Sequence, residues 1–343
     1  MKKSLLALAV LGAFAGVASA QSSVTLSGTV DASAKYVKNT GTNKLYSLAN
    51  SGLNSSQLVF AGTEDLGGGL KAGFELNAGL GNDTGSSNGT QFFNRRSVVK
   101  LSGAFGEIRL GREYAPSFWN MTVFDAFGTN GVGNSLNVIA PSAAIGVARL
   151  YTGTRRDNSI NYYLPSGIGG VYAQFTAAAG ENGTTTDRAG RYLGGRVGWA
   201  GGPVNVAVSY AQQKYSSGAV DTKNLNVGGS FDLGVVKLMG YWDHGKQGST
   251  KNNLYSVSAV VPVGQGEIHA SYNLDKLKLA TSSNKVDQFA VGYVYNLSKR
   301  TAVYTTVARL NNKDNTALFI PGGNGITAGG KSTGAELGLR HFF

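Results

Sequence analysis

The sequence predicts an all-β fold: an antiparallel β-barrel of about sixteen strands that crosses a membrane. Three observations support this prediction. They are an export signal at the N-terminus, an alternation of apolar and polar residues with a period of two, and a regular exchange of short turns and long loops. The chain has 343 residues, of which 50 are Gly, 6 are Pro and none is Cys. Without disulfide bonds, hydrogen bonding and packing must hold this fold together.

The N-terminal segment has the three regions of a secretory signal peptide. Two lysines follow the initiating methionine, an apolar run covers residues 5–17, and an Ala-Ser-Ala triplet ends at Ala20. We expect residues 1–20 to be cleaved before Gln21, which leaves 21–343 as one barrel domain. The apolar run is shorter than the ~20 residues that a spanning helix needs, so a membrane anchor is the less favoured alternative.

Alternation of apolar and polar residues recurs along the mature chain, for example in 24–36, 70–77 and 204–210. Successive side chains of a strand point to opposite faces, so each such segment has one apolar and one polar face. The last ten residues, GAELGLRHFF, follow the same rule, with Leu337 on the apolar side and Arg340 on the polar side. We therefore expect the apolar face to meet lipid and the polar face to meet water.

Short turns and long polar loops alternate between the predicted strands. Tight turns are expected at 63–69, 104–106, 165–169, 200–203, 232–234, 262–266 and 296–299. Long loops are expected near 37–56, 79–92, 113–154, 178–190, 212–223, 243–253, 274–286 and 310–332. This rhythm predicts an even-stranded barrel with both termini at the short-turn end.

A soluble β-sandwich is the alternative fold, because its strands would alternate as well. The export signal, the loop rhythm and an aromatic C-terminal residue, Phe343, favour the barrel. Unpaired backbone groups would be costly in lipid, so the sheet has to close on itself. Aromatic residues near the predicted strand ends suit the girdles at membrane interfaces; they are Tyr36, Tyr210, Tyr272 and Tyr293.

The charge balance requires an anionic partner. The formal net charge is +12, and removal of Lys2 and Lys3 with the signal peptide would leave +10. Basic loops and rims could contact anionic headgroups of outer-membrane lipid. Fixed positive charge inside a narrow channel would instead concentrate anions. The sequence leaves both interpretations open.

Other motifs give little support to enzymatic or nucleotide-binding functions. Residues 325–332 spell the phosphate-binding pattern G-x4-G-K-S, but the strand and helix that this pattern requires are not predicted around it. The three histidines, at 244, 269 and 341, are scattered, and no Ser/His/Asp grouping can be argued. We therefore expect no enzyme activity, no cofactor, no metal site and no nucleic-acid partner. A barrel enzyme is the least favoured alternative.

Several segments resemble a known family. They are GTEDLGGGLKAGFEL at 62–76, RRSVVKLSGAFGEIRLGRE at 95–113, RRDNSINYYLPSG at 155–167, GYVYNLSKRTAVY at 292–304 and the terminal GLRHFF. The chain is similar to the general porins of Gram-negative bacteria, specifically the trimeric Neisseria-type and β-proteobacterial branch. The resemblance implies a 16-stranded barrel in the outer membrane, with a third long loop that folds inward and narrows a water-filled channel.

The same resemblance implies passive diffusion of ions and small hydrophilic solutes, with a preference for anionic solutes. It also implies a homotrimer, and recognition of the terminal aromatic residue, Phe343, by the barrel-assembly machinery. A substrate-selective porin with a binding site in the constriction is the alternative within the channel class.

The expected inward loop, near 114–154, contains the apolar residues Phe118, Trp119, Val123, Phe124 and Phe127, which insertion into the lumen would explain. Asp125 and Glu113 are its acidic candidates for facing the pore. In the alternative interpretation, Asp125 caps a local turn and the aromatic residues only pack the loop against the wall.

Opposite this loop, the resemblance implies a ladder of basic residues on the barrel wall. Arg155 matches one position, and outward parity of Ile160 predicts that Arg155 and Asp157 face inward. Arg95 and Arg96 match another position. Parity favours Arg96 as the inward residue, although a bulge could exchange the two.

The family often has Arg where this sequence has Gln57, which weakens the inference of strong anion selectivity. Further basic residues are expected on inward parities and could still make the lumen positive; they are Lys71, Lys100, Arg109, Arg196 and Arg340.

Overall fold

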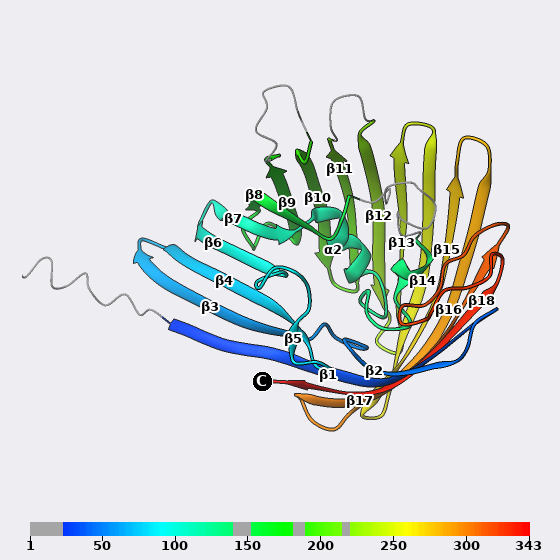
Figure 1. Ribbon diagram of the computed structural model, residues 1–343. Coiled ribbons are helices and arrows are strands. Elements are labelled where there is room, and N and C mark those ends of the chain that lie inside the picture. Colours follow the sequence, from blue (N-terminus) through cyan, green and yellow to red (C-terminus); the bar gives the residue numbers. More distant parts are fainter. Residues whose placement is uncertain (1–22, 140–151, 181–188, 215–219) are drawn as a thin grey trace, which may run out of the picture.

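The structure is a computed structural model that describes residues 23–139, 152–180, 189–214 and 220–343 (Figure 1). The predicted signal peptide lies outside the described residues. The elements in chain order are β1 Ser23–Asn39, β2 Leu45–Asn50, β3 Gln57–Gly67, β4 Leu70–Gly81, β5 Ser86–Ser87, β6 Arg96–Gly103, β7 Gly106–Tyr114, α2 Pro116–Val123, η1 Ser135–Val138, β8 Arg155–Tyr163, β9 Val171–Ala178, β10 Tyr192–Gly201, β11 Val204–Gln213, β12 Thr222–Asp232, β13 Lys237–Gln247, β14 Thr250–Val263, β15 Gly266–Lys278, β16 Ser283–Asn296, β17 Thr301–Lys313 and β18 Lys331–Phe342.

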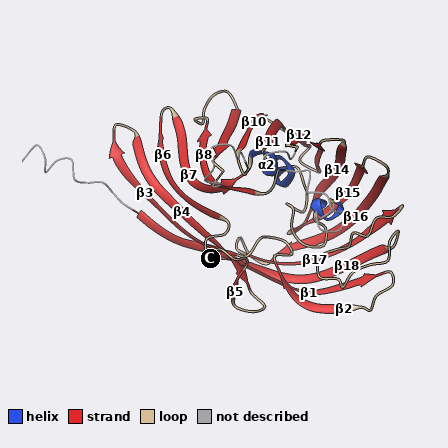
Figure 2. Cartoon of the chain, turned by 45° about the horizontal axis from the view of Figure 1, so that its top comes forward, coloured by secondary structure: helices blue, strands red, loops and turns tan. Residues whose placement is uncertain are grey.

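Antiparallel pairing runs from strand to strand and returns from β18 to β1, so the sheet is closed. The short strands β2 and β5 belong to loops, and the other sixteen strands form the barrel wall. The predicted fold class is therefore confirmed. Figure 2 shows the helical segments inside the ring of strands. Among the described residues, no helix is long and apolar enough to span a membrane.

The barrel closes between the first and last strands, in a register that pairs Thr29 with Phe342 and Asn39 with Ser332. At the end of this seam, the Gly28 and Phe343 backbones exchange two hydrogen bonds, with N···O distances of 3.0 and 3.1 Å. A Cβ on Gly28 would lie 2.4 Å from the Phe343 ring. The absence of a side chain at Gly28 therefore lets the terminal ring pack across the seam.

The two faces of the strands differ as the alternation predicts. Outward apolar side chains are exposed on the isolated chain, including Leu337 at 64%, Leu339 at 49% and Val257 at 60%. Inward positions are mostly polar or small. Ser256 and Ser258, which flank Val257 along β14 and point inward, are both buried. Apolar exposure on this scale fits a surface that lipid covers.

A buried aspartate draws part of the first loop into the lumen. Asp31 of β1 accepts hydrogen bonds from the backbone N–H groups of Leu53 at 2.9 Å and Asn54 at 2.6 Å. It also accepts one from the Tyr304 hydroxyl at 2.5 Å. Residues 51–56, between β2 and β3, are thereby fixed against the inner wall.

Each predicted tight turn contains a connection between consecutive strands, which confirms that part of the connection pattern, although β3 continues to Gly67 and leaves only residues 68–69 of the predicted turn at 63–69. Two predicted long loops are wrong. Within 243–253, β13 and β14 continue until only residues 248–249 connect them, and within 274–286 only 279–282 separate β15 from β16. These strands extend beyond the apolar band, where both faces carry polar residues, so polarity alone suggested loops there.

A local irregularity reverses one predicted side-chain direction. The β7–β8 register shifts between Gly111 and Glu113, and Asn158 has a φ of 50°, in the left-handed region. Asp157 forms an ion pair with Arg112, which lies on the outward parity of β7. The prediction that Asp157 faces inward is therefore wrong, because parity cannot be carried through a bulge.

Replacing Leu337 with Arg tests the assignment of faces. Leu337 lies midway along β18 on the outward parity, so a charge there should lower the free energy of unfolding by roughly 2–4 kcal/mol. Reversible urea unfolding in lipid vesicles measures the change. Gln57→Arg, on the inward face, is the matched control and should cost much less. Equal losses would contradict the assignment.

Candidate functional site

The third long loop lies inside the barrel, as the resemblance implied (Figure 2). It begins after Tyr114 and reaches β8, and residues 140–151 within it lie outside the described part. The helix α2 starts with Pro116, whose missing N–H is not needed in a first helical turn. This helix lies against the inner wall formed by β10, β11 and β12.

Apolar side chains attach this loop to the wall. Met121 and Phe124 are fully buried. A Cβ on Gly228 of β12 would lie 2.3 Å from the Phe124 ring, so glycine is needed for this contact. Phe127 meets His269 of β15 edge-on, with ring centroids 5.7 Å apart. Of the predicted apolar residues, Phe124 and Phe127 thus hold the loop on the β12–β15 side of the lumen, whereas Phe118 and Trp119 pack on Tyr114.

The far end of the loop reaches across to the opposite side. The Val132 backbone N–H donates to Glu336 Oε1 of β18 at 3.0 Å, and Gln288 of β16 donates to the Asn134 carbonyl at 3.1 Å. Ser55 of the first loop donates to Asn130 at 2.8 Å. The loop therefore bridges the lumen and is tied to both sides.

Asp125 holds the loop in shape. Its carboxylate accepts hydrogen bonds from the Phe127 and Thr129 backbone at 3.0 and 3.1 Å, and from Ser135 through both its backbone N–H and its hydroxyl. Burial raises the pKa of the Asp125 carboxyl from its ordinary value, and these hydrogen bonds oppose that rise. The geometry matches the local turn-cap interpretation, because all four donors belong to the same loop, although Asp125 also lies at the edge of the lumen.

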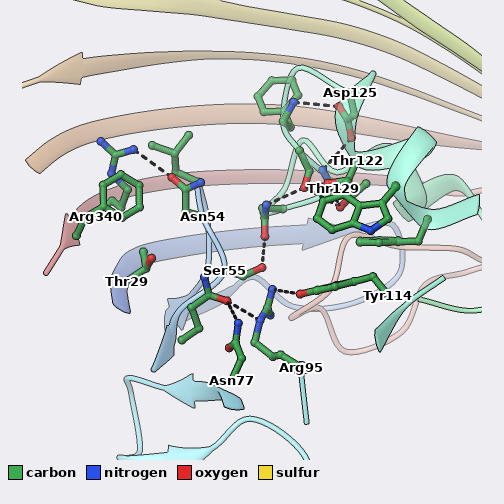
Figure 3. Close-up of a pocket in the computed structure, with 18 of the residues that line it drawn as sticks. Thr29, Asn54, Ser55, Asn77, Arg95, Tyr114, Thr122, Asp125, Thr129 and Arg340 are labelled. Atoms are coloured by element: carbon green, nitrogen blue, oxygen red, sulfur yellow. Dashed lines mark hydrogen bonds between the residues drawn. The ribbon is translucent and has the colours of Figure 1, made fainter. Parts of the chain in front are cut away.

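The bridging loop leaves an opening along the wall of β1, β3, β4 and β6 (Figure 3). Its volume is about 610 Å³, and a second cavity of about 500 Å³ adjoins it towards the long-loop end. Arg95 lines both cavities, whereas Arg155 lines only the second. A solute that crosses the barrel along this wall passes Arg95.

Arg95 is held by neutral partners. Its Nε donates to Gln57 Oε1 at 2.9 Å, and its Nη2 donates to the Tyr114 hydroxyl at 2.8 Å. Asn77 donates to the same Gln57 oxygen at 3.0 Å. Gln57 thus orients the guanidinium without neutralising it.

Arg155 shares the same phenol. Its Nη2 donates to the Tyr114 hydroxyl at 2.9 Å, and its guanidinium lies 4.4 Å from the centroid of the Tyr114 ring. Within the described residues, neither Arg155 nor Arg95 forms an ion pair. Tyr114 therefore brings two positive charges together without a carboxylate between them.

Arg96, by contrast, belongs to a neutralised cluster. It contacts Glu75 at 2.6 Å and Glu113 at 2.9 Å, and Arg109 contacts Glu113 at 2.7 Å and Glu107 at 2.5 Å. Glu113 is fully buried beneath these groups. Its carboxylate therefore balances arginines and does not face the pore as a free acid.

The six predicted constriction residues all lie in this region, but in different roles. Arg95 and Arg96 both point into the lumen, because Arg95 precedes the first residue of β6 and is not bound by its parity. The remaining four are Arg155 beside the opening, Gln57 as an orienting partner, and Glu113 and Asp125 as internal acceptors.

Sequence reasoning missed Tyr114, Glu75, Glu267 and the first-loop residues Asn54 and Ser55, which all line the opening. Tyr114 carried a usable signal, since it adjoins Glu113 at the start of the long loop. The inward position of Asn54 depends on Asp31, and no local pattern revealed that contact.

A closed transmembrane barrel with a bridging internal loop and a lined opening defines a channel-forming outer-membrane protein. A family model described as Gram-negative porin matches residues 7–315. The chain belongs to this family, and it is located in the outer membrane.

Two relatives and two solved structures illustrate the similarity. Outer membrane porin protein 32 of Delftia acidovorans is 43% identical, and an outer membrane porin protein of Bordetella pertussis is 30% identical, each over 100% of both chains. An anion-selective porin from Comamonas acidovorans is 40% identical with a TM-score of 0.84, over 94% of this chain and 100% of that one. OmpT of Vibrio cholerae in its trimer form, at 14% identity and a TM-score of 0.65 over 94% and 99%, shares the fold.

Asp125→Asn tests the role of the turn cap. The asparagine amide keeps only one acceptor oxygen, so it cannot accept all the hydrogen bonds that the Asp125 carboxylate accepts. Each hydrogen bond to the charged carboxylate stabilises the loop by about 1.5–3 kcal/mol. We expect the internal loop to loosen, which single-channel recording would detect as increased open-channel noise and brief closures. Asp287→Asn, on the outer face, is the control. Recordings as quiet as those of the wild type would exclude the role.

Proposed function

We propose that this porin is a passive diffusion channel that prefers anions, and that Arg95 and Arg155 are the main source of the preference. One observation carries the proposal: both guanidinium groups lie at the narrowed passage and share a neutral phenol, without an ion pair among the described residues. Small hydrophilic solutes cross by diffusion, and anionic ones are favoured.

The physical basis is fixed positive charge beside a narrow water-filled path. Such charge raises the local concentration of anions and repels cations. In dilute salt the Debye length reaches ~30 Å, so the effect extends across the whole opening. Arg340, which donates to Asn54 at 3.2 Å and lines the same opening, adds to it. The anion-selective porin to which this chain is similar supports the proposal.

The opening also has an acidic side. Glu75 and Glu267 line it, from β4 and β15 respectively. Glu75 is paired with Arg96, so its charge is largely compensated. Because the constriction site has acids as well as arginines, we expect a moderate anion preference and not exclusion of cations.

The double variant Arg95→Gln/Arg155→Gln tests the proposed filter. Two charges ~5 Å apart in water interact by about 0.8 kcal/mol, so each removed arginine should lower the chloride-over-potassium permeability ratio roughly fourfold in dilute salt. Reversal potentials across a salt gradient measure the ratio. Arg300→Gln/Arg309→Gln, on exposed positions of the turn and outer face, removes the same charge as a control. Equal shifts in both double variants would contradict a local filter.

Two further variants, Gln57→Arg and Arg96→Gln, test whether added charge at the opening and loss of a paired arginine have different effects on the chloride-over-potassium permeability ratio. An arginine at 57 adds positive charge beside Arg95, so the ratio should rise. Loss of Arg96 leaves Glu113 and Glu75 short of a partner, so heat stability should fall more than anion preference does.

We further propose three properties that rest on the family. The chain catalyses no reaction, three copies assemble into a homotrimer, and the barrel-assembly machinery recognises Phe343. For the homotrimer, the support is Phe92 on the second loop, which is exposed on the isolated chain and packs edge-on against the half-buried Phe93. For Phe343, the support is its position at the end of the closing strand, beside Gly28.

Deleting Phe343 should reduce insertion into the outer membrane by tenfold or more, while the barrel refolded in detergent should conduct normally. The residue would then serve recognition and not the channel. Quantitative membrane fractionation and heat-modifiable gel mobility measure insertion, with Phe342→Ala as the neighbouring control. Normal insertion of the deletion variant would exclude an assembly role.

A further inference from the structure

Four lysines stand side by side on four consecutive strands. The strand register pairs Lys223 of β12 with Lys246 of β13, Lys246 with Lys251 of β14, and Lys251 with Lys278 of β15. We call these four residues the lysine row. Neighbouring strands lie ~4.8 Å apart, so the row presents a line of positive charge across three strand spacings.

The row faces outward and is uncompensated. All four lysines are exposed, on the parity that carries Val227, Trp242 and Tyr255. The outward positions of β12–β15 include no Asp or Glu, and no lysine of the row forms an ion pair with a described residue. Like charges directly opposite one another destabilise a sheet. An anionic ligand would remove this cost.

The height of the row matches a membrane headgroup layer. Trp242 and Tyr255 pair with each other across β13 and β14. Each lies four residues from Lys246 or Lys251 along its strand, in the direction of the barrel end that holds the two chain termini. Aromatic residues mark the interface between hydrocarbon and headgroups. Four residues span ~13 Å of strand, so the lysines lie above the hydrocarbon, at the long-loop end, where phosphate groups of the outer leaflet are.

An apolar hollow lies on the same strands towards the turn end. Gly229 of β12 pairs directly with Gly240 of β13, so neither strand has a side chain there. The hollow has a volume of about 860 Å³, and its walls include Val206, Val208 and Val257. Its lining is almost wholly apolar and it opens on the lipid-facing side, so it suits a hydrocarbon chain.

We propose that the outer face of β11–β15 binds one acylated lipid of the outer leaflet whose headgroup carries at least two phosphates. The phosphates lie on the lysine row and an acyl chain fills the hollow at Gly229 and Gly240. Charge complementarity selects the headgroup, and the hollow retains the chain. The site is separate from the channel and rests on the outer-membrane location.

The test compares Lys246→Gln/Lys251→Gln with Lys71→Gln/Lys299→Gln, a control that removes two lysines from the opposite end. The probe is lipid A, a bis-phosphorylated acylated glucosamine disaccharide, in neutral detergent micelles, with bound lipid counted by native mass spectrometry. Because each lysine near an anionic surface contributes about 1 kcal/mol, or about fivefold in affinity, the row variant should bind lipid A roughly thirtyfold more weakly, and the control variant should bind it as the wild type does. Equal binding by wild type and row variant would overturn the proposal.

Two further measurements separate the parts of the site. Val257→Trp fills the hollow and should weaken lipid A binding, while leaving single-channel conductance unchanged; unchanged binding would overturn the role of the hollow. Without lipid, the row variant should melt at the same or a higher temperature than the wild type, because repulsion is relieved, and lipid A should stabilise only the wild type. Competition by inorganic phosphate at the same concentration as lipid A would show an ion site and overturn the lipid assignment.

Discussion

Pairing between β1 and β18 is the interaction on which the other features depend, because a strand in hydrocarbon cannot leave its N–H and C=O groups unpaired. Once the sheet closes, one set of side chains must face lipid and the other must face an enclosed space. Asp31 lies on this seam and binds the first loop, while Glu336 lies on it and binds the third loop. The same two strands therefore close the wall and anchor both inserted segments that narrow the channel.

The arginines of the lumen fall into two groups that differ in their hydrogen-bond partners. Arg96 and Arg109 surround Glu113 and are balanced by it and by neighbouring acids, so they stiffen the wall. Arg95 and Arg155 meet on the Tyr114 hydroxyl, which orients them without cancelling their charge. A carboxylate bound to these guanidinium groups would cancel their positive charge, and the opening would then no longer attract anions. A phenol orients the groups and leaves their charge in place. An arginine of this wall is therefore structural when its guanidinium contacts a carboxylate, and contributes to anion preference when its guanidinium contacts a neutral hydroxyl.

The sequence was sufficient for the strand pattern, the faces and the tight turns, because these depend on local periodicity. It failed where geometry is not local. The bulge at Asn158 turned Asp157 outward, and the extension of β13–β16 above the apolar band made strands look like loops. The inward turn of Asn54 depends on Asp31, a distant residue, and the neutralisation of Arg96 depends on Glu113 across the sheet. Contacts between distant residues determine the site, and periodicity does not encode them.

The reversal potential of the wild-type channel, measured over a series of potassium chloride gradients of falling mean concentration, tests the central claim most directly. If uncompensated arginines at the constriction attract anions, the chloride-over-potassium permeability ratio exceeds one and rises steadily as salt is diluted, because screening weakens. A ratio at or below one, or one that does not change with concentration, would contradict the account, since the positive charge would then lie away from the path of the ions.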